Sequence, residues 1–135
     1  MKARIYHAHA RCTYGRLTEK REQALIRRMF PEYEIVDPGL YEENEEKRLG
    51  GMDYCMKLVD SCNALAFSRI LDKVTSGVGV EVEHALASGK PVYELIGGGV
   101  RRVSEPPVYI SIDETLQLYD EWEYENFDEL EAEIQ

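Results

Sequence analysis

Short apolar runs alternate along this sequence with longer stretches of helical periodicity, and this alternation limits the possible folds more than any other feature. Four runs lie at residues 3–10, 33–38, 64–70 and 91–96, and a further strand is expected at residues 106–112. Strands that alternate with helices are typical of a parallel sheet flanked by helices. We therefore expect an α/β fold, in which ligands bind at the carboxyl ends of the strands.

The stretches between the apolar runs predict the helices. Apolar residues near helical spacing extend from Leu17 to Met29, and Pro31 predicts the end of this helix. Apolar residues three or four apart indicate a second helix over residues 52–62. A third helix is predicted from about residue 80 to residue 88, with Gly89 as its C-cap.

The length and composition indicate one globular domain outside the membrane. A chain of 135 residues is too short for two hydrophobic cores. No apolar run approaches the roughly 18 residues of a membrane span, and the opening segment lacks the apolar region of a secretory signal. Cys12, Cys55 and Cys62 show no C-x-x-C spacing of a zinc site or redox pair. We expect a cytoplasmic protein.

The formal net charge of −10 is concentrated near the C-terminus. Ten of the 26 acidic residues and no Lys or Arg lie in residues 113–135, so 16 acids face 16 bases in residues 1–112. The sequence contains no stripe of basic residues that could neutralise a phosphate backbone, so we expect no binding to long nucleic acid. We expect an α/β domain over residues 1–112, and an acidic helical tail that packs on the same domain or on a neighbouring copy. Its apolar and aromatic residues are Leu118, Tyr119, Trp122, Tyr124, Phe127 and Leu130.

An acid, Glu81, directly follows the glycine-rich segment SGVGV. Gly77 and Gly79 let the backbone approach a ligand, and Glu81 is expected in the first turn of the following helix. There the free N–H groups and the helix dipole favour the ionised carboxylate that a nucleophile requires. Such a nucleophile suits displacement at an anomeric carbon through a covalent sugar–enzyme intermediate. An ordinary first-turn acid remains the simpler interpretation.

The segment GVGVEVEHALASGKPVY, residues 77–93, resembles the signature of the nucleoside 2-deoxyribosyltransferase family. That signature consists of a strand, G-x-G-x-E, a helix ending in G-K and a further strand, and the order of segments extends the resemblance to residues 3–96. The resemblance implies a flavodoxin-like (Rossmann-like) parallel sheet and an enzyme that cleaves or exchanges the N-glycosidic bond of a nucleoside. It further implies that Glu81 attacks C1′ of the sugar and expels the base.

The resemblance also implies an acid one helix earlier that assists the departing base. Asp53 is the best match and Asp60 a weaker one, and such a group would protonate or orient the base. The spacing of Asp53, Lys57 and Asp60 fits an exposed polar helix face equally well, so both interpretations stay open.

The sequence departs from the family's pattern at two places. Glu83 replaces a small residue, and it either points to solvent or reshapes the site. His7 and His9 lie in the first strand where small residues are usual. Both are expected to face one side near the strand's carboxyl end and to contact the substrate. A metal would need a third ligand such as His84, and hydrogen-bonded buried histidines are the simpler interpretation. We expect no metal and no cofactor.

Two loops supply the remaining expected substrate contacts. Tyr14 follows the first strand, where the family's substrate loop lies. Thr75 and Ser76 precede Gly77, where hydroxyl and N–H groups at a helix N-terminus can bind an anion such as a 5′-phosphate. These residues also suit ordinary loop and cap positions.

Basic residues add to this expectation. Arg11 and Arg16 flank the first loop and would add positive charge, and residues 97–102, GGGVRR, are expected to form a flexible loop at the rim.

More than one function is compatible with these residues. A free nucleoside is favoured as the substrate, a nucleoside 5′-monophosphate N-hydrolase is the first alternative, and a non-catalytic nucleotide-binding module of the same fold is the second. No feature selects cleavage of a nicotinamide–ribose bond. The resemblance implies a homodimer or larger assembly in which subunits share active sites.

Overall fold

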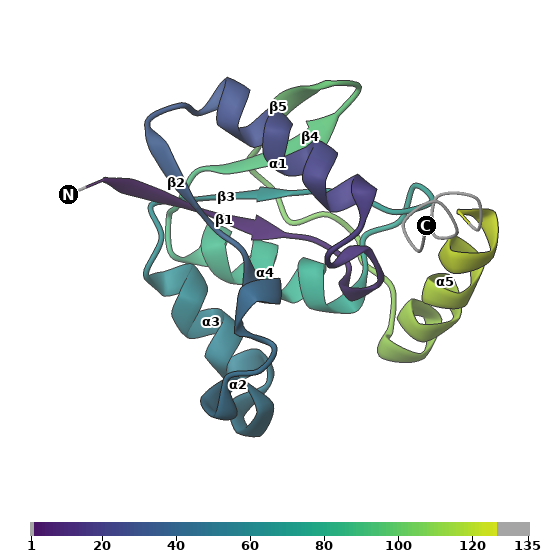
Figure 1. The fold of residues 1–135 in the computed structure, drawn as a ribbon. Coiled ribbons are helices and arrows are strands. Elements are labelled where there is room, and N and C mark those ends of the chain that lie inside the picture. The colour runs from purple at the N-terminus through teal and green to yellow at the C-terminus, as the bar shows by residue number, and fades with distance from the viewer. Residues whose placement is uncertain (1, 127–135) are drawn as a thin grey trace.

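A five-stranded sheet with helices on both faces forms the centre of the molecule (Figure 1). The computed structural model describes residues 2–126, without the side chains of residues 46–48. The strand order is β2-β1-β3-β4-β5, with every pair parallel except β4 and β5. This is the flavodoxin-like order, so the predicted α/β fold class is confirmed. The strands are β1 (Ala3–Ala8), β2 (Tyr33–Val36), β3 (Ala64–Phe67), β4 (Val92–Ile96) and β5 (Gly99–Val103).

The helices divide between the two faces of the sheet. Helix α1 covers one face, and α3 and α4 cover the other (Figure 1). Helix α1 ends just before Pro31, as predicted, and Gly89 has a φ of 74° beyond the end of α4, as a C-capping glycine does. The helical elements are η1 (Arg11–Thr13), α1 (Leu17–Met29), η2 (Pro38–Tyr41), α2 (Glu45–Gly50), α3 (Met52–Asp60), α4 (Ser76–Ala87) and α5 (Ile112–Glu125).

Strand β1 separates two hydrophobic layers because its alternate side chains point to opposite faces. Tyr6 and Ala8 belong to the layer that also holds Val78 and Val82 of α4. Ile5 belongs to the layer packed against α1. The strand that delivers residues to the site is therefore fixed from both sides.

The prediction of a flexible loop at residues 97–102 is wrong, because most of this segment belongs to a β-hairpin. Gly97 and Gly98 have φ values of 58° and 77°, and they connect the paired residues Ile96 and Gly99. Two successive positive φ values are typical of a type I′ hairpin turn, for which Gly-Gly is a favoured sequence. The resulting strand β5 is antiparallel to β4 at the edge of the sheet.

The prediction of a strand at residues 106–112 is also wrong. Only Tyr109 pairs in this segment, in an isolated bridge with Val74. Pro106 and Pro107 cannot donate backbone hydrogen bonds to a sheet, which accounts for the short pairing. The segment instead leads into α5.

Helix α5 packs on the same domain that carries the sheet. It begins with a capping box, in which the Ser111 hydroxyl accepts from the Glu114 N–H and the Glu114 carboxylate accepts from the Ser111 N–H. Leu118 and Trp122 are buried in a cluster with Ala10. Tyr119 packs against this cluster, whereas Tyr124 is exposed. The remaining two predicted tail residues, Phe127 and Leu130, lie outside the described residues.

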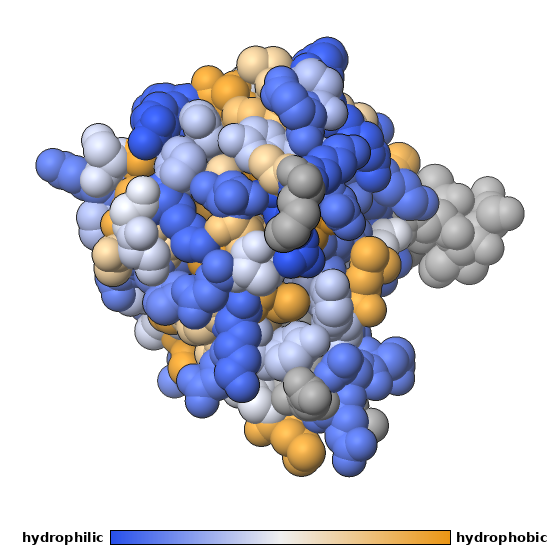
Figure 2. Space-filling view, turned by 90° about the vertical axis from the view of Figure 1, so that its left-hand side faces the viewer, coloured by the Kyte–Doolittle hydropathy of each residue, from blue (hydrophilic) through white to orange (hydrophobic). Residues whose placement is uncertain are grey.

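Figure 2 shows the end of the molecule at which β1 begins, which lies opposite α5. Hydrophilic side chains cover most of this end, and hydrophobic ones are scattered among them. In the described part of the chain, the helices are too short or too polar to cross a membrane.

Candidate functional site

A cavity of about 520 Å³ lies beyond the carboxyl ends of β1 and β3. The strand order reverses between these two strands, and α/β folds bind ligands at such a switch point. The cavity walls come from the segment after β1, from the start of α3, from α4 and from α5. The lining residues are His9, Arg11, Tyr14, Glu42, Gly51, Met52, Cys55, Thr75, Gly77, Val78, Glu81 and Tyr119.

Glu81 lines this cavity although its exposed fraction is only 6%. The hydroxyl of Tyr6, which β1 directs toward α4, donates a hydrogen bond to Glu81 Oε2. Burial, reinforced by the charge of Glu81, raises the pKa of Tyr6, so the phenol keeps its proton and remains a donor. The site therefore combines a buried carboxylate, a fixed hydrogen-bond donor and a volume that a ligand can fill.

The position of Glu81 within α4 differs from the prediction. The helix begins at Ser76, with Thr75 as N-cap, which is four residues earlier than expected. Glu81 therefore lies in the second turn and not in the first. The influence of the helix dipole is confined largely to the first turn, so the expected role of the dipole is wrong. The hydrogen bond from Tyr6 is one interaction that orients this carboxylate.

The glycines before Glu81 lie inside the helix, and one of them is required by packing. A Cβ added at Gly79 would overlap the ring of Tyr109. A Cβ at Gly77 would meet only Met52 Sδ, at 3.9 Å. The close approach of the segment before α5 explains why a glycine is needed at position 79. Gly77, in contrast, faces the cavity.

The four residues at the start of α4 that were expected to contact the substrate divide into two pairs. Thr75 and Gly77 line the cavity. Ser76 and Gly79 do not belong to the lining: the Ser76 N–H donates to Thr115 Oγ1 at 2.9 Å, and Gly79 is covered by Tyr109. One N–H group at the start of α4 is thus already bonded within the protein.

Two tyrosines contribute hydroxyl groups to the cavity wall. Tyr14 lines it, as predicted from its position after the first strand, and burial together with the charge of Glu81 raises its pKa. Tyr119 reaches the cavity from α5, and its hydroxyl accepts a bond from the Arg11 N–H at 3.4 Å. Burial raises the pKa of Tyr119 as well. Both phenols therefore remain protonated near neutral pH.

The two histidines of β1 and its extension face the same side, as predicted. Their rings stack with centroids 3.8 Å apart. His7 is fully buried beside α1, where Nε2 lies 2.8 Å from Glu22 Oε1, and it is not part of the cavity lining. Burial lowers the pKa of His7 despite this partner.

His9, by contrast, lines the cavity. Burial alone would lower its pKa, but the pairing with Glu19, the His7 carbonyl and Asp37 raises it. Burial would raise the pKa of Glu19, but the interactions with His9, Asp37 and the Gly15 N–H hold it at about 2.

Other predicted acids lie on the surface. Asp53 is exposed in the first turn of α3 and is not among the lining residues. Asp60 is exposed and lies 2.7 Å from His84 Nε2, and Glu83 is exposed as well. The structure therefore brings none of these carboxylates to the cavity that holds Glu81.

A different acid, Glu42, lines the cavity from the loop after η2. Its Oε2 lies 3.2 Å from Arg11 Nη2. Of the two arginines that were expected to add positive charge, Arg11 belongs to the cavity lining and Arg16 does not. The sequence gives no signal for Glu42, which lies within a run of polar residues without motif spacing. It gives none for the site roles of Tyr6 and Tyr119 either, because these roles depend on contacts between distant segments.

No protein-family model, curated protein or solved structure matches the chain. The resemblance to the nucleoside 2-deoxyribosyltransferase family therefore stays a prediction that rests on the sequence of residues 3–96.

Proposed function

We propose that this protein cleaves or exchanges the N-glycosidic bond of a nucleoside or deoxynucleoside, with Glu81 as the nucleophile. The observation that carries the proposal is the position of Glu81, a buried carboxylate that is hydrogen-bonded by Tyr6 and faces the cavity at the switch point of the sheet. Enzymes that form a covalent sugar intermediate use a carboxylate of this kind.

In the proposed reaction, a Glu81 oxygen forms a bond to C1′ while the C1′–N bond breaks. The electron pair of that bond leaves with the base, which takes up a proton. Water or a second base then attacks C1′, loses its own proton and restores the free carboxylate. Both displacements pass through an oxocarbenium-like transition state, which the negative charge of Glu81 stabilises.

The cavity's size and lining support a nucleoside as ligand. Its volume of about 520 Å³ falls within the range of small-molecule sites. Apolar surface for a base comes from Met52 and from the rings of Tyr14 and Tyr119. The hydroxyl groups of the two tyrosines can form hydrogen bonds with sugar hydroxyls.

Protonation of the leaving base needs an acid, and two candidates are proposed. Glu42 belongs to the lining and would act directly, after it takes up a proton and so gives up its ion pair with Arg11. Asp53, the residue implied by the resemblance, would have to approach the ligand from its exposed position on α3.

The charges of the described lining favour a free nucleoside over a 5′-monophosphate. Two glutamates and one arginine line the cavity, and Arg11 is already paired with Glu42. A phosphate dianion would therefore face repulsion with little compensating positive charge. Hydrolysis of a 5′-monophosphate remains the alternative, for which Arg11 and the Thr75 hydroxyl would supply the contacts.

The test is release of free base from deoxynucleosides, ribonucleosides and their 5′-monophosphates, with and without a second base, followed by chromatography. We expect release by the wild-type protein and a loss of at least about a thousandfold in Glu81→Gln, because the nucleophile is removed. Glu83→Gln is the matched control: it changes an exposed glutamate of the same helix and should retain wild-type activity.

Two results would contradict the proposal. Base release that is unchanged in Glu81→Gln would show that another group is the nucleophile. Binding of nucleotides without release from any substrate, by folded wild-type protein, would identify a non-catalytic nucleotide-binding module.

A further inference from the structure

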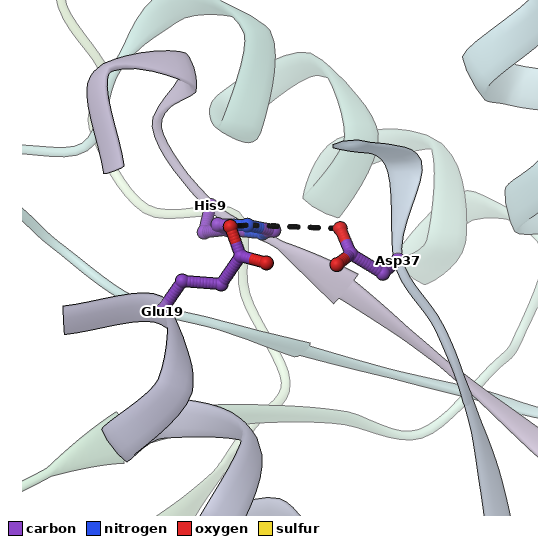
Figure 3. Close-up of side chains that lie close together, drawn as sticks. All are labelled: His9, Glu19 and Asp37. Carbon is purple, nitrogen blue, oxygen red and sulfur yellow. Dashed lines mark ion pairs between the residues drawn. The ribbon is translucent and has the colours of Figure 1, made fainter. Parts of the chain in front are cut away.

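His9, Glu19 and Asp37 form a compact buried cluster from three segments (Figure 3). His9 follows β1, Glu19 lies in the first turn of α1, and Asp37 follows β2. Their exposed fractions are 3%, 8% and 6%. In the part of the chain that the structure describes, this is the one group of three side chains with metal-ligating atoms at suitable separations.

The hydrogen bonds of His9 define which ring nitrogen can bind a ligand. Nδ1 lies 2.8 Å from the backbone carbonyl of His7, and a carbonyl only accepts, so Nδ1 carries a proton. The other nitrogen, Nε2, is buried and makes no hydrogen bond. It lies 3.3 Å from Glu19 Oε2 and 3.9 Å from Asp37 Oδ1. An unprotonated Nε2 would therefore direct its lone pair toward two carboxylates, an arrangement that either a proton on Nε2 or a metal cation between the three groups would stabilise.

The spacing of the three ligand atoms fits one small ion. Two ligands about 2.1 Å from a tetrahedral Zn²⁺ are about 3.4 Å apart. The Nε2–Oε2 distance already has this value, and all three atoms lie within 4.8 Å of one another. Inward movement of the Asp37 carboxylate by about 1 Å would complete the site.

Neighbouring groups orient the two carboxylates. The Gly15 N–H donates to Glu19 Oε2 at 2.6 Å, and the Gly39 N–H donates to Asp37 Oδ1 at 2.9 Å. Gln23 Nε2 donates to the second oxygen of Asp37 at 2.9 Å. Together with the His7 carbonyl behind His9, these bonds orient every ligand, as the outer partners of metal ligands do.

We propose that His9 Nε2, Glu19 and Asp37 bind one divalent transition-metal ion, with Zn²⁺ favoured. One imidazole and two carboxylates suit Zn²⁺ or Mn²⁺, whereas Ca²⁺ requires six or more oxygen ligands. Because His9 also lines the cavity, the proposed site adjoins that space. The proposal replaces the expectation of no metal, and it does not depend on the chemistry assigned to Glu81.

The only set of ligands considered from the sequence was His7, His9 and His84, and it was not favoured. The structure pairs His7 with Glu22 and His84 with Asp60. The two carboxylates that join His9 come from α1 and from the end of β2, and no sequence motif connects them.

The test is equilibrium dialysis of the full chain, stripped with a chelator, against Zn²⁺, Mn²⁺, Mg²⁺ or Ca²⁺, with bound metal measured by elemental analysis. We expect about one Zn²⁺ per chain, weaker Mn²⁺ binding, and a loss of affinity of at least about tenfold in Glu19→Gln and in Asp37→Asn. Asp60→Asn removes the carboxylate of the surface pair with His84 and should bind Zn²⁺ like the wild type. Circular dichroism verifies that each variant is folded.

The visible spectrum of the Co²⁺-substituted wild type provides a reading that needs no variant. Nitrogen and oxygen ligands should give d–d bands without the near-ultraviolet charge-transfer band of a thiolate. Zn²⁺ on fewer than about one chain in ten, unchanged affinity in both variants, or a thiolate band would overturn the proposal. Binding of Mg²⁺ or Ca²⁺ in preference to Zn²⁺ would overturn it as well. If Zn²⁺ does not bind, His9 Nε2 carries a proton and forms an ion pair with the two carboxylates.

Discussion

The hydroxyl group of Tyr6 connects the core of the sheet to the candidate nucleophile. Tyr6 is fully buried, and its aromatic ring packs in the layer beneath α4 while its oxygen bonds Glu81. A donor to a carboxylate favours the ionised form and fixes its direction. Tyr6 is thus a positioning residue, since it acts on a substrate through Glu81.

Replacing Tyr6 by Phe should lower base release by about ten- to a hundredfold, because a hydrogen bond to a charged group contributes roughly 1.5–3 kcal/mol. The acidic limb of the pH–rate profile should also move to higher pH, because a carboxylate without its donor accepts a proton more readily. A purely structural role would not shift the profile. Tyr33→Phe, in the layer next to α1, is the control. Wild-type kinetics at every pH in Tyr6→Phe would contradict the assigned role.

The residues of the site differ in how far the sequence could predict them. Glu81, Tyr14, Thr75 and Gly77 belong to local motifs or follow predicted strands, and they line the cavity. Contacts such as that of Tyr6 with Glu81 join residues 75 positions apart. Periodicity shows that alternate residues of β1 face opposite layers, but it does not show which layer holds the cavity.

The start of α4 illustrates how tertiary packing changes an element. Glycines normally disfavour a helix, which is why the helix was predicted to begin after them. The structure places both in the helix, because Tyr109 packs where a Cβ of Gly79 would lie. The interaction that compensates for the poor helix propensity comes from a segment 30 residues away, and local sequence does not reveal it.

Gly79→Ala should destabilise the protein by about 1–3 kcal/mol, because the new methyl group displaces the ring of Tyr109. Gly77→Ala is the matched control in the same turn. Its Cβ has room, and alanine should stabilise the helix by up to about 1 kcal/mol. Urea denaturation measures both free energies of unfolding. Equal stability of the two variants would contradict the packing described for Gly79.

Breaker residues in the sequence could have predicted both the β4–β5 hairpin and the irregular segment after it. Gly97 and Gly98 between two strand-forming runs are a direct signal for a type I′ turn. The segment 106–112 contains β-branched and aromatic residues, but two prolines prevent regular pairing. Weight given to breakers within an apolar run would have corrected both predictions.

The arrangement of the whole molecule follows from the order of its elements. Alternating strands and helices predict a parallel sheet, and the reversal between β1 and β3 predicts where a ligand binds. The order of elements does not predict where α5 packs. Leu118 and Trp122 pack with Ala10, and this contact brings Tyr119 into the cavity wall. An amphipathic pattern predicts that a helix has a buried face, but not which element that face contacts.

A covalent sugar on Glu81 is the central claim, and peptide mapping tests it most directly. Wild-type protein is incubated with a 2′-fluorinated analogue of its best substrate, which slows breakdown of the intermediate by disfavouring the oxocarbenium-like transition state. After an acid quench, fragmentation of the tryptic peptide spanning residues 74–101 distinguishes Glu81 from Glu83 and Glu94. We predict one sugar, attached to Glu81. Base release accompanied by a sugar on another residue, or by no labelled residue, would contradict the account.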